Sequence, residues 1–212
     1  MSVQAQDPRY AMSTLCIGGK LSTTGYTPVV GNKLISSALA ADIRAHGSIF
    51  GNWGPGSDNT KRFRMADVLI TEVGMGAFRK FSDVKEDFYL SYRIGLGIQT
   101  YYSINEDVDA GFKYALLANG DNTHDVDESG KAIGLFMRWK ELLVNVDIQS
   151  GKVYREQRVQ LRYLVGADRN KYFLFELTGG SIKNPLPFEK IGTTRMMFGF
   201  GFNTFSPQNP SR

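Results

Sequence analysis

Residues 88–104, FYLSYRIGLGIQTYYSI, alternate between two kinds of side chain. Every second residue from Phe88 is large and apolar, apart from Thr100, whereas the residues between them are tyrosine, serine, arginine, glycine or glutamine. A period of two residues places successive side chains on opposite faces of a strand. At ~3.3 Å per residue and a tilt of ~40°, Phe88 to Tyr102 rises roughly 35 Å. The stretch therefore predicts a two-faced strand long enough to cross an apolar layer of ~25 Å.

The same alternation recurs along most of the chain. It is found at 11–23, 37–51, 62–78, 108–116, 133–139, 142–148, 159–165, 173–177 and 196–202. Asp67 falls on the apolar face of its stretch and counts against that assignment. The prolines fall between or outside these stretches, as expected for a residue that cannot donate to a sheet ladder. We predict an all-β fold: an antiparallel up-and-down transmembrane β-barrel of about ten strands, with eight as the alternative.

The connections between these stretches are expected to alternate in length. The long ones are 24–35, 82–86, 119–131 and 180–192, and the short ones are 105–107, 140–141 and 168–170. The segment 52–60 is an exception, because it is long where a short turn is expected. Long loops at one end and tight turns at the other are typical of bacterial outer-membrane barrels.

The polar face distinguishes a membrane barrel from a soluble ligand-binding barrel, which also alternates. A water-facing surface is rich in charged residues, but here the polar face holds mainly glycine, serine, glutamine, tyrosine and isolated charges. We therefore expect lipid against the apolar face, and a soluble lipocalin-like carrier is the alternative. The expected lipid-facing residues are Phe88, Leu90, Tyr92, Ile94, Leu96, Ile98, Trp139, Phe198, Phe200 and Phe202.

Charged residues of both signs share the polar faces. They are Asp42, Arg44, Glu72, Arg93, Asp109, Lys113, Asp147, Arg158, Arg162, Glu176 and Arg195. Buried charges are costly unless they are paired, and a barrel of about ten strands leaves little space beyond its own side chains. We expect a salt-bridged network that fills the lumen, with a restricted polar pore as the alternative.

One group of residues has the spacing of a catalytic site. His46 and Ser48 share one strand face, where a histidine can take the proton of a serine, and Glu72 on the next expected strand can orient the imidazole. This His-x-Ser spacing resembles that of the outer-membrane lipid A deacylases, but that family carries it late in the chain. The expected register also points His46 into the lumen, away from acyl chains, so we expect no enzymatic activity.

Composition excludes several other classes of protein. The chain has 212 residues, 22% charged and 42% hydrophobic, with a net charge of +4 and one cysteine, Cys16. Nucleic-acid binding is not expected, because no dense Lys/Arg run or RNA-binding signature is present. A transmembrane helix is excluded by the absence of a long apolar run. No phosphate-binding loop, zinc pattern or dinucleotide fingerprint is present, so we expect no metal and no cofactor.

The last expected strand, RMMFGFGFNTF, resembles the C-terminal strand of small bacterial outer-membrane β-barrel proteins, which commonly ends in an aromatic residue. It departs from that pattern because residues 206–212 follow Phe205. The onset Ala-Gln-Asp-Pro at 5–8 is similar to the mature starts of exported Bacteroidota proteins, and Val3 and Ala5 fit a signal-peptidase site. The resemblance implies a bacterial outer-membrane location with both termini in the periplasm. We divide the chain into an N-terminal segment 1–10, a barrel 11–205 and a tail 206–212.

We expect the barrel to act as a structural or accessory subunit of a cell-envelope assembly. Its partners would be membrane lipid and other outer-membrane or periplasmic proteins. The alternatives are a narrow porin-like channel, an outer-membrane lipid-modifying acyl hydrolase and the soluble ligand carrier. A fold by itself does not select among these functions.

Overall fold

The structure is a computed structural model that describes residues 14–28, 34–47, 49, 52–53, 63–79, 86–105, 107–122, 126–152, 154–166, 171–183 and 188–203. Its elements are all strands: β1 (Thr14–Pro28), β2 (Leu34–Gly47), β3 (Asn52–Trp53), β4 (Phe63–Arg79), β5 (Glu86–Ser103), β6 (Val108–Asp121), β7 (Val126–Trp139), β8 (Leu142–Gly151), β9 (Tyr154–Val165), β10 (Lys171–Lys183) and β11 (Phe188–Asn203). In the described part of the chain, no helix has the length and apolar character needed to cross a membrane.

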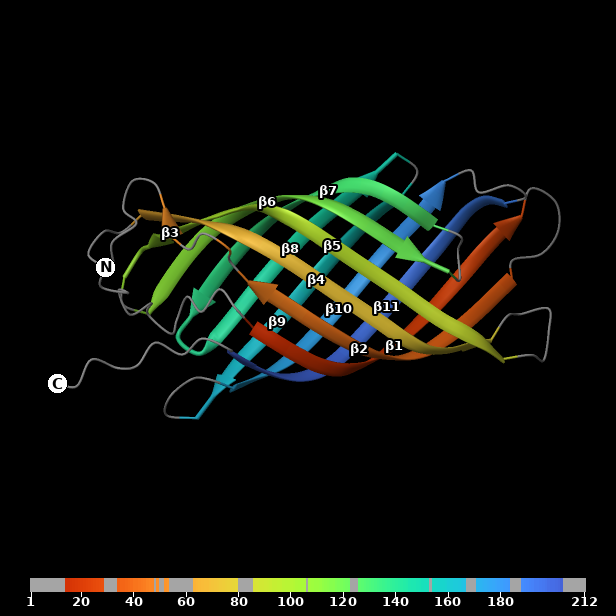
Figure 1. Ribbon diagram of the computed structural model, residues 1–212, viewed down its shortest axis with the longest axis horizontal. Helices are drawn as coiled ribbons and strands as arrows, with labels where there is room; N and C mark the ends of the chain where they lie inside the picture. The colour runs from red at the N-terminus through yellow and green to blue at the C-terminus, as the bar shows by residue number, and fades with distance from the viewer. Residues whose placement is uncertain are drawn as a thin grey trace.

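The strands form a closed antiparallel barrel (Figure 1). Neighbours in sequence pair with one another from β4 to β11, β11 pairs with β1, and β2 closes the circle by pairing with β4. The two-residue β3 pairs with β4 beyond the end of β2, so β2 and β3 together occupy one position in a ten-strand barrel. The predicted all-β up-and-down barrel of about ten strands is therefore confirmed.

The break between β2 and β3 explains why Asp67 interrupts the apolar face of β4. Gly47 pairs with Leu69 and Asn52 with Ala66, so β2–β3 carries extra residues at this point, as in a β-bulge. The Ile49 amide donates to Asp67 Oδ2 at 2.5 Å, and the Asp67 side chain is buried. Asp67 thus satisfies a backbone donor that the interrupted ladder leaves without its usual carbonyl.

The expected alternation of long and short connections is wrong in its extent, because strands continue into three of the expected long loops. β1 ends at Pro28 and β2 begins at Leu34, where a loop over 24–35 was expected. Likewise, β6 and β7 leave only a few residues of 119–131, and β10 and β11 only a few of 180–192. The alternation is weaker there, because glycine and polar residues also occur within strand ends that extend beyond the apolar belt.

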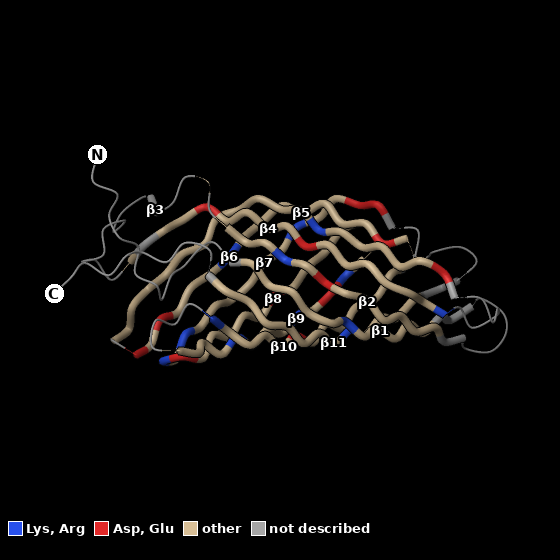
Figure 2. The backbone as a smooth tube through the Cα atoms, turned by 60° about the horizontal axis from the view of Figure 1, so that its bottom comes forward, with Lys and Arg blue, Asp and Glu red and all other residues tan. Residues whose placement is uncertain are grey.

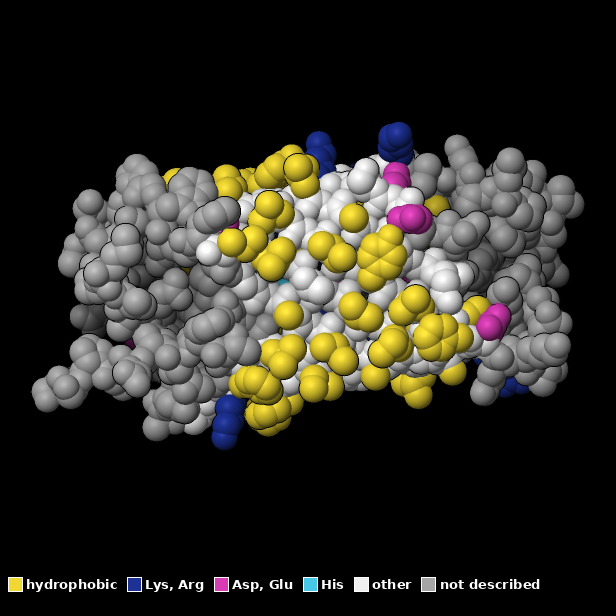
Figure 3. Space-filling view, viewed as in Figure 1, with side chains coloured by type: hydrophobic (Ala, Val, Ile, Leu, Met, Phe, Trp, Pro, Cys, Tyr) yellow, Lys and Arg dark blue, Asp and Glu magenta, His cyan; other side chains and the backbone are white. Residues whose placement is uncertain are grey.

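The outer wall carries the apolar face of nearly every strand. Leu39 and Leu135 are each 66% exposed and Phe198 is 60% exposed. On the visible face, hydrophobic side chains are spread over the middle among other side chains and backbone, and charged side chains lie toward the margins (Figure 3). So many exposed large apolar residues on one surface exceed what a soluble monomer presents. The wall has instead the apolar band of an outer-membrane barrel.

Both ends of the described chain lie at the same end of the barrel, since Thr14 pairs with Asn203. Exposed aromatic residues stand near this end of their strands, at Tyr102, Trp139, Tyr163 and Phe202. Toward the opposite end, β7 and β9 instead expose polar residues on the outward face: Lys131, Arg155 and Gln157. We call these three residues the polar sector. The apolar belt therefore covers less of β7 and β9 toward the end opposite the termini.

The inner face is packed closely. A buried apolar cluster fills part of the lumen and includes Ile70, Phe136 and Tyr172. Gly97 on β5 lies so close to β6 that a Cβ atom there would meet the Tyr114 carbonyl oxygen and Ala115 Cα. Glycine allows this approach of two backbones because it has no side chain.

Candidate functional site in the barrel lumen

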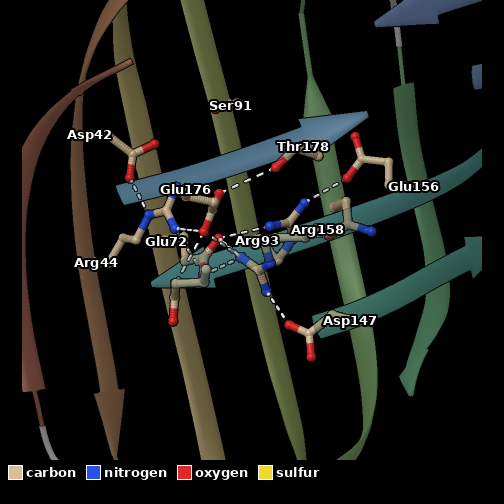
Figure 4. Close-up of polar contacts among 12 residues, drawn as sticks. Asp42, Arg44, Glu72, Ser91, Arg93, Asp147, Glu156, Arg158, Glu176 and Thr178 are labelled. Carbon is tan, nitrogen blue, oxygen red and sulfur yellow. Dashed lines mark hydrogen bonds and ion pairs between the residues drawn. The ribbon is translucent and has the colours of Figure 1, made fainter. Parts of the chain in front are cut away.

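Charged side chains from several strands meet inside the barrel (Figure 4). Figure 2 marks the positions of charged residues along the backbone. Glu72 on β4 is the centre of this lumen network. Arg158 Nη1 donates to Glu72 Oε1 at 2.9 Å and to Oε2 at 3.1 Å. Arg93 Nη1 donates to Glu72 Oε2 at 2.8 Å, and His46 Nε2 lies 2.9 Å from Oε1. One buried carboxylate therefore joins residues from β2, β5 and β9.

A second carboxylate, Glu176 on β10, forms a forked contact with Arg44. Arg44 Nη1 donates to Glu176 Oε2, and Arg44 Nη2 donates to Oε1 at 3.0 Å. Gln160 Nε2 donates to Glu176 Oε2 at 3.1 Å. Arg44 Nε also donates to Asp42 Oδ1 at 2.7 Å. The guanidinium is thus held in one orientation, the bidentate geometry that strengthens arginine–carboxylate pairs.

Two more carboxylates extend the network along the lumen. Lys113 Nζ donates to Asp147 Oδ2 at 2.9 Å, and Arg158 Nη2 donates to the same oxygen at 3.2 Å. Glu156 accepts from Arg93 Nη2 at 2.9 Å and from Arg195 Nη2. Gly134 makes room for Asp147, because a Cβ there would meet Asp147 Oδ1.

The network crosses the full width of the barrel. In the strand order, β4 and β9 stand on opposite sides of the circle, so the Arg158–Glu72 contact spans the lumen. Desolvation of each of these ions is costly, and the cost is offset only because every charge has partners of the opposite sign at close range. Removing a single member therefore weakens the compensation of each charge that it contacts.

Two small cavities lie beside the lumen network. One, of about 70 Å³, is bordered by Lys20, Arg44, Glu72, Arg93 and Glu176, among others. The other, of about 60 Å³, is bordered by His46, Lys113, Asp147, Arg158 and Gln160, among others. They share no lining residue. Residues of the lumen network border both cavities, and neither cavity has the size of an open aqueous channel.

The structure brings together most of the residues expected in the lumen. Asp42, Arg44, Glu72, Arg93, Lys113, Asp147, Arg158, Glu176 and Arg195 form the connected set described above. Arg162 borders the same cavity as Lys113 and Asp147, and its guanidinium lies 5.8 Å from the Tyr172 ring centroid. Asp109 is fully buried and accepts from Arg138 Nε in a separate pair.

The expected set omitted Lys20 and Glu156, which belong to the lumen network, and Arg138, which pairs with Asp109. Lys20 Nζ lies 3.2 Å from Asp42 Oδ2, so it belongs to the lumen network. Each of the three shares the parity of an inward residue on its own strand, such as Cys16, Phe136 or Arg158. The alternation along each strand therefore assigns all three side chains to the inward face. Glu156 was overlooked because β9 begins earlier than expected, at Tyr154.

The candidate catalytic residues are only partly described. His46 and Glu72 are within hydrogen-bond distance, as the expected register requires. Ser48 lies outside the described residues, as do the N-terminal segment 1–10 and the tail 206–212. Glu72 also binds Arg93 and Arg158, so its carboxylate is shared among several cations. Within the described ranges, no three His, Cys, Asp or Glu side chains are grouped so that they could hold a metal ion.

The residues expected to face lipid lie on the outward side of their strands. All of them except Tyr92 have exposed side chains. Tyr92 is half-buried, and its hydroxyl donates to Asp127 Oδ1 at 2.6 Å.

Comparisons with known proteins return solved structures only. No protein-family model and no curated protein matches the sequence. The chain is similar to an outer-membrane channel from Pseudomonas putida F1, with 10% identity, a TM-score of 0.48, and coverage of 90% of this chain and 94% of that one. It is also similar to the KdgM porin in complex with disordered oligogalacturonate, with 11% identity, a TM-score of 0.43 and coverage of 91% and 99%. Neisserial surface protein A matches with 11% identity, a TM-score of 0.38 and coverage of 89% and 96%.

Proposed function

We propose that this outer-membrane barrel has a sealed lumen and works through its outer surfaces, as a structural or accessory subunit of a cell-envelope assembly. The observation that supports this most is the lumen network between two cavities that share no lining residue. A barrel blocked at its centre by paired charges is poorly suited to passive diffusion. Its accessible surfaces are its wall and its two ends.

The polar sector is the part of the wall best suited to a protein partner. Lys131, Arg155 and Gln157 are exposed on the outward face of β7 and β9. Polar side chains on the outside of a barrel are costly against lipid but are ordinary components of protein interfaces. We therefore place the docking surface for another envelope protein at this sector.

Photo-cross-linking in native membranes tests this proposal. A photoreactive residue at position 157, in the polar sector, is expected to give one defined cross-linked protein band. The same residue at position 96, on the apolar belt, is expected to give none. Equal cross-linking at both positions, or no band at either, would contradict a docking surface in the polar sector.

Both termini are proposed to lie in the periplasm, at the end where Thr14 pairs with Asn203. A protease site appended to the C-terminus should remain uncut in intact cells and be cut once the outer membrane is permeabilised. Cleavage in intact cells would reverse the orientation.

A narrow, gated polar channel is the second candidate, and the two polar cavities on either side of the network favour it. Planar-bilayer recording separates the two functions. The sealed barrel should give no steady conductance, whereas Arg158→Ala, which removes the contact across the lumen, should give measurable openings. Steady conductance by the unaltered protein would favour the channel.

A further inference from the structure

The outer wall contains an apolar groove that is separate from the lumen network. It has a volume of about 350 Å³ and runs over β8 to β11. Its lining residues are Leu142, Leu161, Tyr163, Phe173, Leu174, Phe175, Phe198 and Gly199. The Phe175 and Phe198 ring centroids are 5.1 Å apart, which makes a continuous aromatic edge between β10 and β11.

The groove leads toward the end of the barrel that carries Thr14 and Asn203. Phe173 pairs with Tyr163 and with Phe200 there, and both Phe173 and Tyr163 are more than half exposed. Lys171 is the next outward residue of β10 beyond Phe173, at the start of the strand, and its side chain is exposed. Residues two apart on a strand share one face and stand ~7 Å apart. An exposed cation therefore stands at the rim of an apolar groove.

We propose that the groove binds one anionic phospholipid, with an acyl chain along the aromatic wall and the phosphate at Lys171. The order of groups along the wall matches such an amphiphile: an apolar groove, then the amphipathic Tyr163, then a cation. Tyrosine and lysine are the side chains that anchor to the headgroup region of a bilayer. The proposal rests on the outer-membrane location of the barrel but not on its having a protein partner.

Fluorescence quenching by brominated lipids tests the site. The chain has two tryptophans, Trp53 and Trp139, and Trp139 pairs with the groove residue Leu142. A Trp53→Phe protein therefore reports from beside the groove. In phosphatidylcholine vesicles with a small fraction of acyl-brominated lipid, brominated phosphatidylglycerol should quench Trp139 more strongly than brominated phosphatidylcholine.

Lys171→Gln should reduce the preference for the anionic lipid about fivefold, as expected for a contribution of about 1 kcal/mol from one lysine at a membrane surface. Lys152→Gln is the matched control: it removes an exposed lysine between β8 and β9 that does not border the groove, and it should keep the preference. Equal quenching by both lipids, or an unchanged preference in Lys171→Gln, would overturn the proposal.

A second copy of the chain in the groove is the competing occupant. It would give a dimer in mild detergent that Phe198→Ala dissociates, and that result would also overturn the proposal. A protein that fails to insert into vesicles shows no heat-dependent shift on a denaturing gel. The gel therefore tests whether the membrane barrel has folded, independently of whether the groove binds lipid. An absent shift would count against the membrane barrel itself.

Discussion

Arg158 Nη1 lies 2.9 Å from Glu72 Oε1, although the two residues are 86 positions apart and come from strands on opposite sides of the barrel. The contact therefore ties the two walls together through the middle of the lumen. Both side chains are almost fully buried, at 2% and 5% exposed. Such a pair is sensitive to the loss of one partner, because the other is then a buried charge that has lost its nearest counter-ion.

Glu72→Gln should be strongly destabilising for this reason. The neutral amide keeps the shape of the side chain but leaves Arg93 and Arg158 without their common carboxylate. We expect a loss of about 3–5 kcal/mol in the free energy of unfolding, measured by urea titration in lipid vesicles. Asp107→Asn, at an exposed turn position, should change it by less than about 0.5 kcal/mol. Equal effects of the two substitutions would contradict a central role for Glu72.

Gly97→Val should impair folding, because its side chain would collide with the backbone of β6 at Tyr114 and Ala115. Overpacking of this kind costs about 1–3 kcal/mol. Gly179→Val is the matched control, since nothing lies within 4 Å of a Cβ at that position. The fraction of protein that migrates as the folded form on an unboiled gel should fall for the first variant only. A similar fall in both would mean that the close approach of β5 and β6 is unimportant.

Asp67→Ala should loosen the junction between β2 and β3. The Ile49 amide then loses the side-chain acceptor, at a cost of about 1–3 kcal/mol. Asp67→Asn keeps an oxygen acceptor, so the Ile49 amide should stay largely protected from hydrogen exchange. Hydrogen exchange at the Ile49 amide measures the difference directly, and slow exchange in the alanine variant would show that another group accepts this proton.

Leu96→Arg distinguishes lipid from water outside the barrel. Leu96 is 51% exposed in the middle of β5. Against lipid, an arginine near the middle of the apolar band costs about 2–4 kcal/mol, whereas against water it would be nearly neutral. Gln157→Arg replaces one exposed polar side chain of the polar sector with another and should change the free energy of unfolding by less than about 0.5 kcal/mol. Urea titration in vesicles compares the two, and a neutral Leu96→Arg would contradict the membrane barrel.

Much of the fold could be predicted from the period of two residues alone. Parity assigns each side chain to a face, so Phe88, Leu96 and Phe198 could be placed outside, and Arg44 and Glu72 inside, without knowledge of register. The stagger between strands could not be read in this way, because it depends on how all the strands close into a circle. Hence the sequence indicated a network of charges but not the contact between Arg158 and Glu72.

Other features depend on local exceptions to the alternation. Asp67 looked like evidence against a strand, because the sequence does not show that a backbone donor at Ile49 needs its carboxylate. The groove on β8 to β11 depends on the shapes of side chains from four strands, and parity gives only their common face.

The pairing of β1 with β11 has a consequence for how the barrel must form. These strands contain the first and last described residues, Thr14 and Asn203, and their ladder runs almost the whole length of both. Until β11 is in place, β1 and β10 are both unpaired edges, which invite pairing with other chains. Barrel closure therefore depends on the pairing of the first and last strands, β1 and β11. Contacts between residues so far apart in sequence slow folding. A chain shortened before β11 would lack the strand that closes the barrel and would be prone to aggregate.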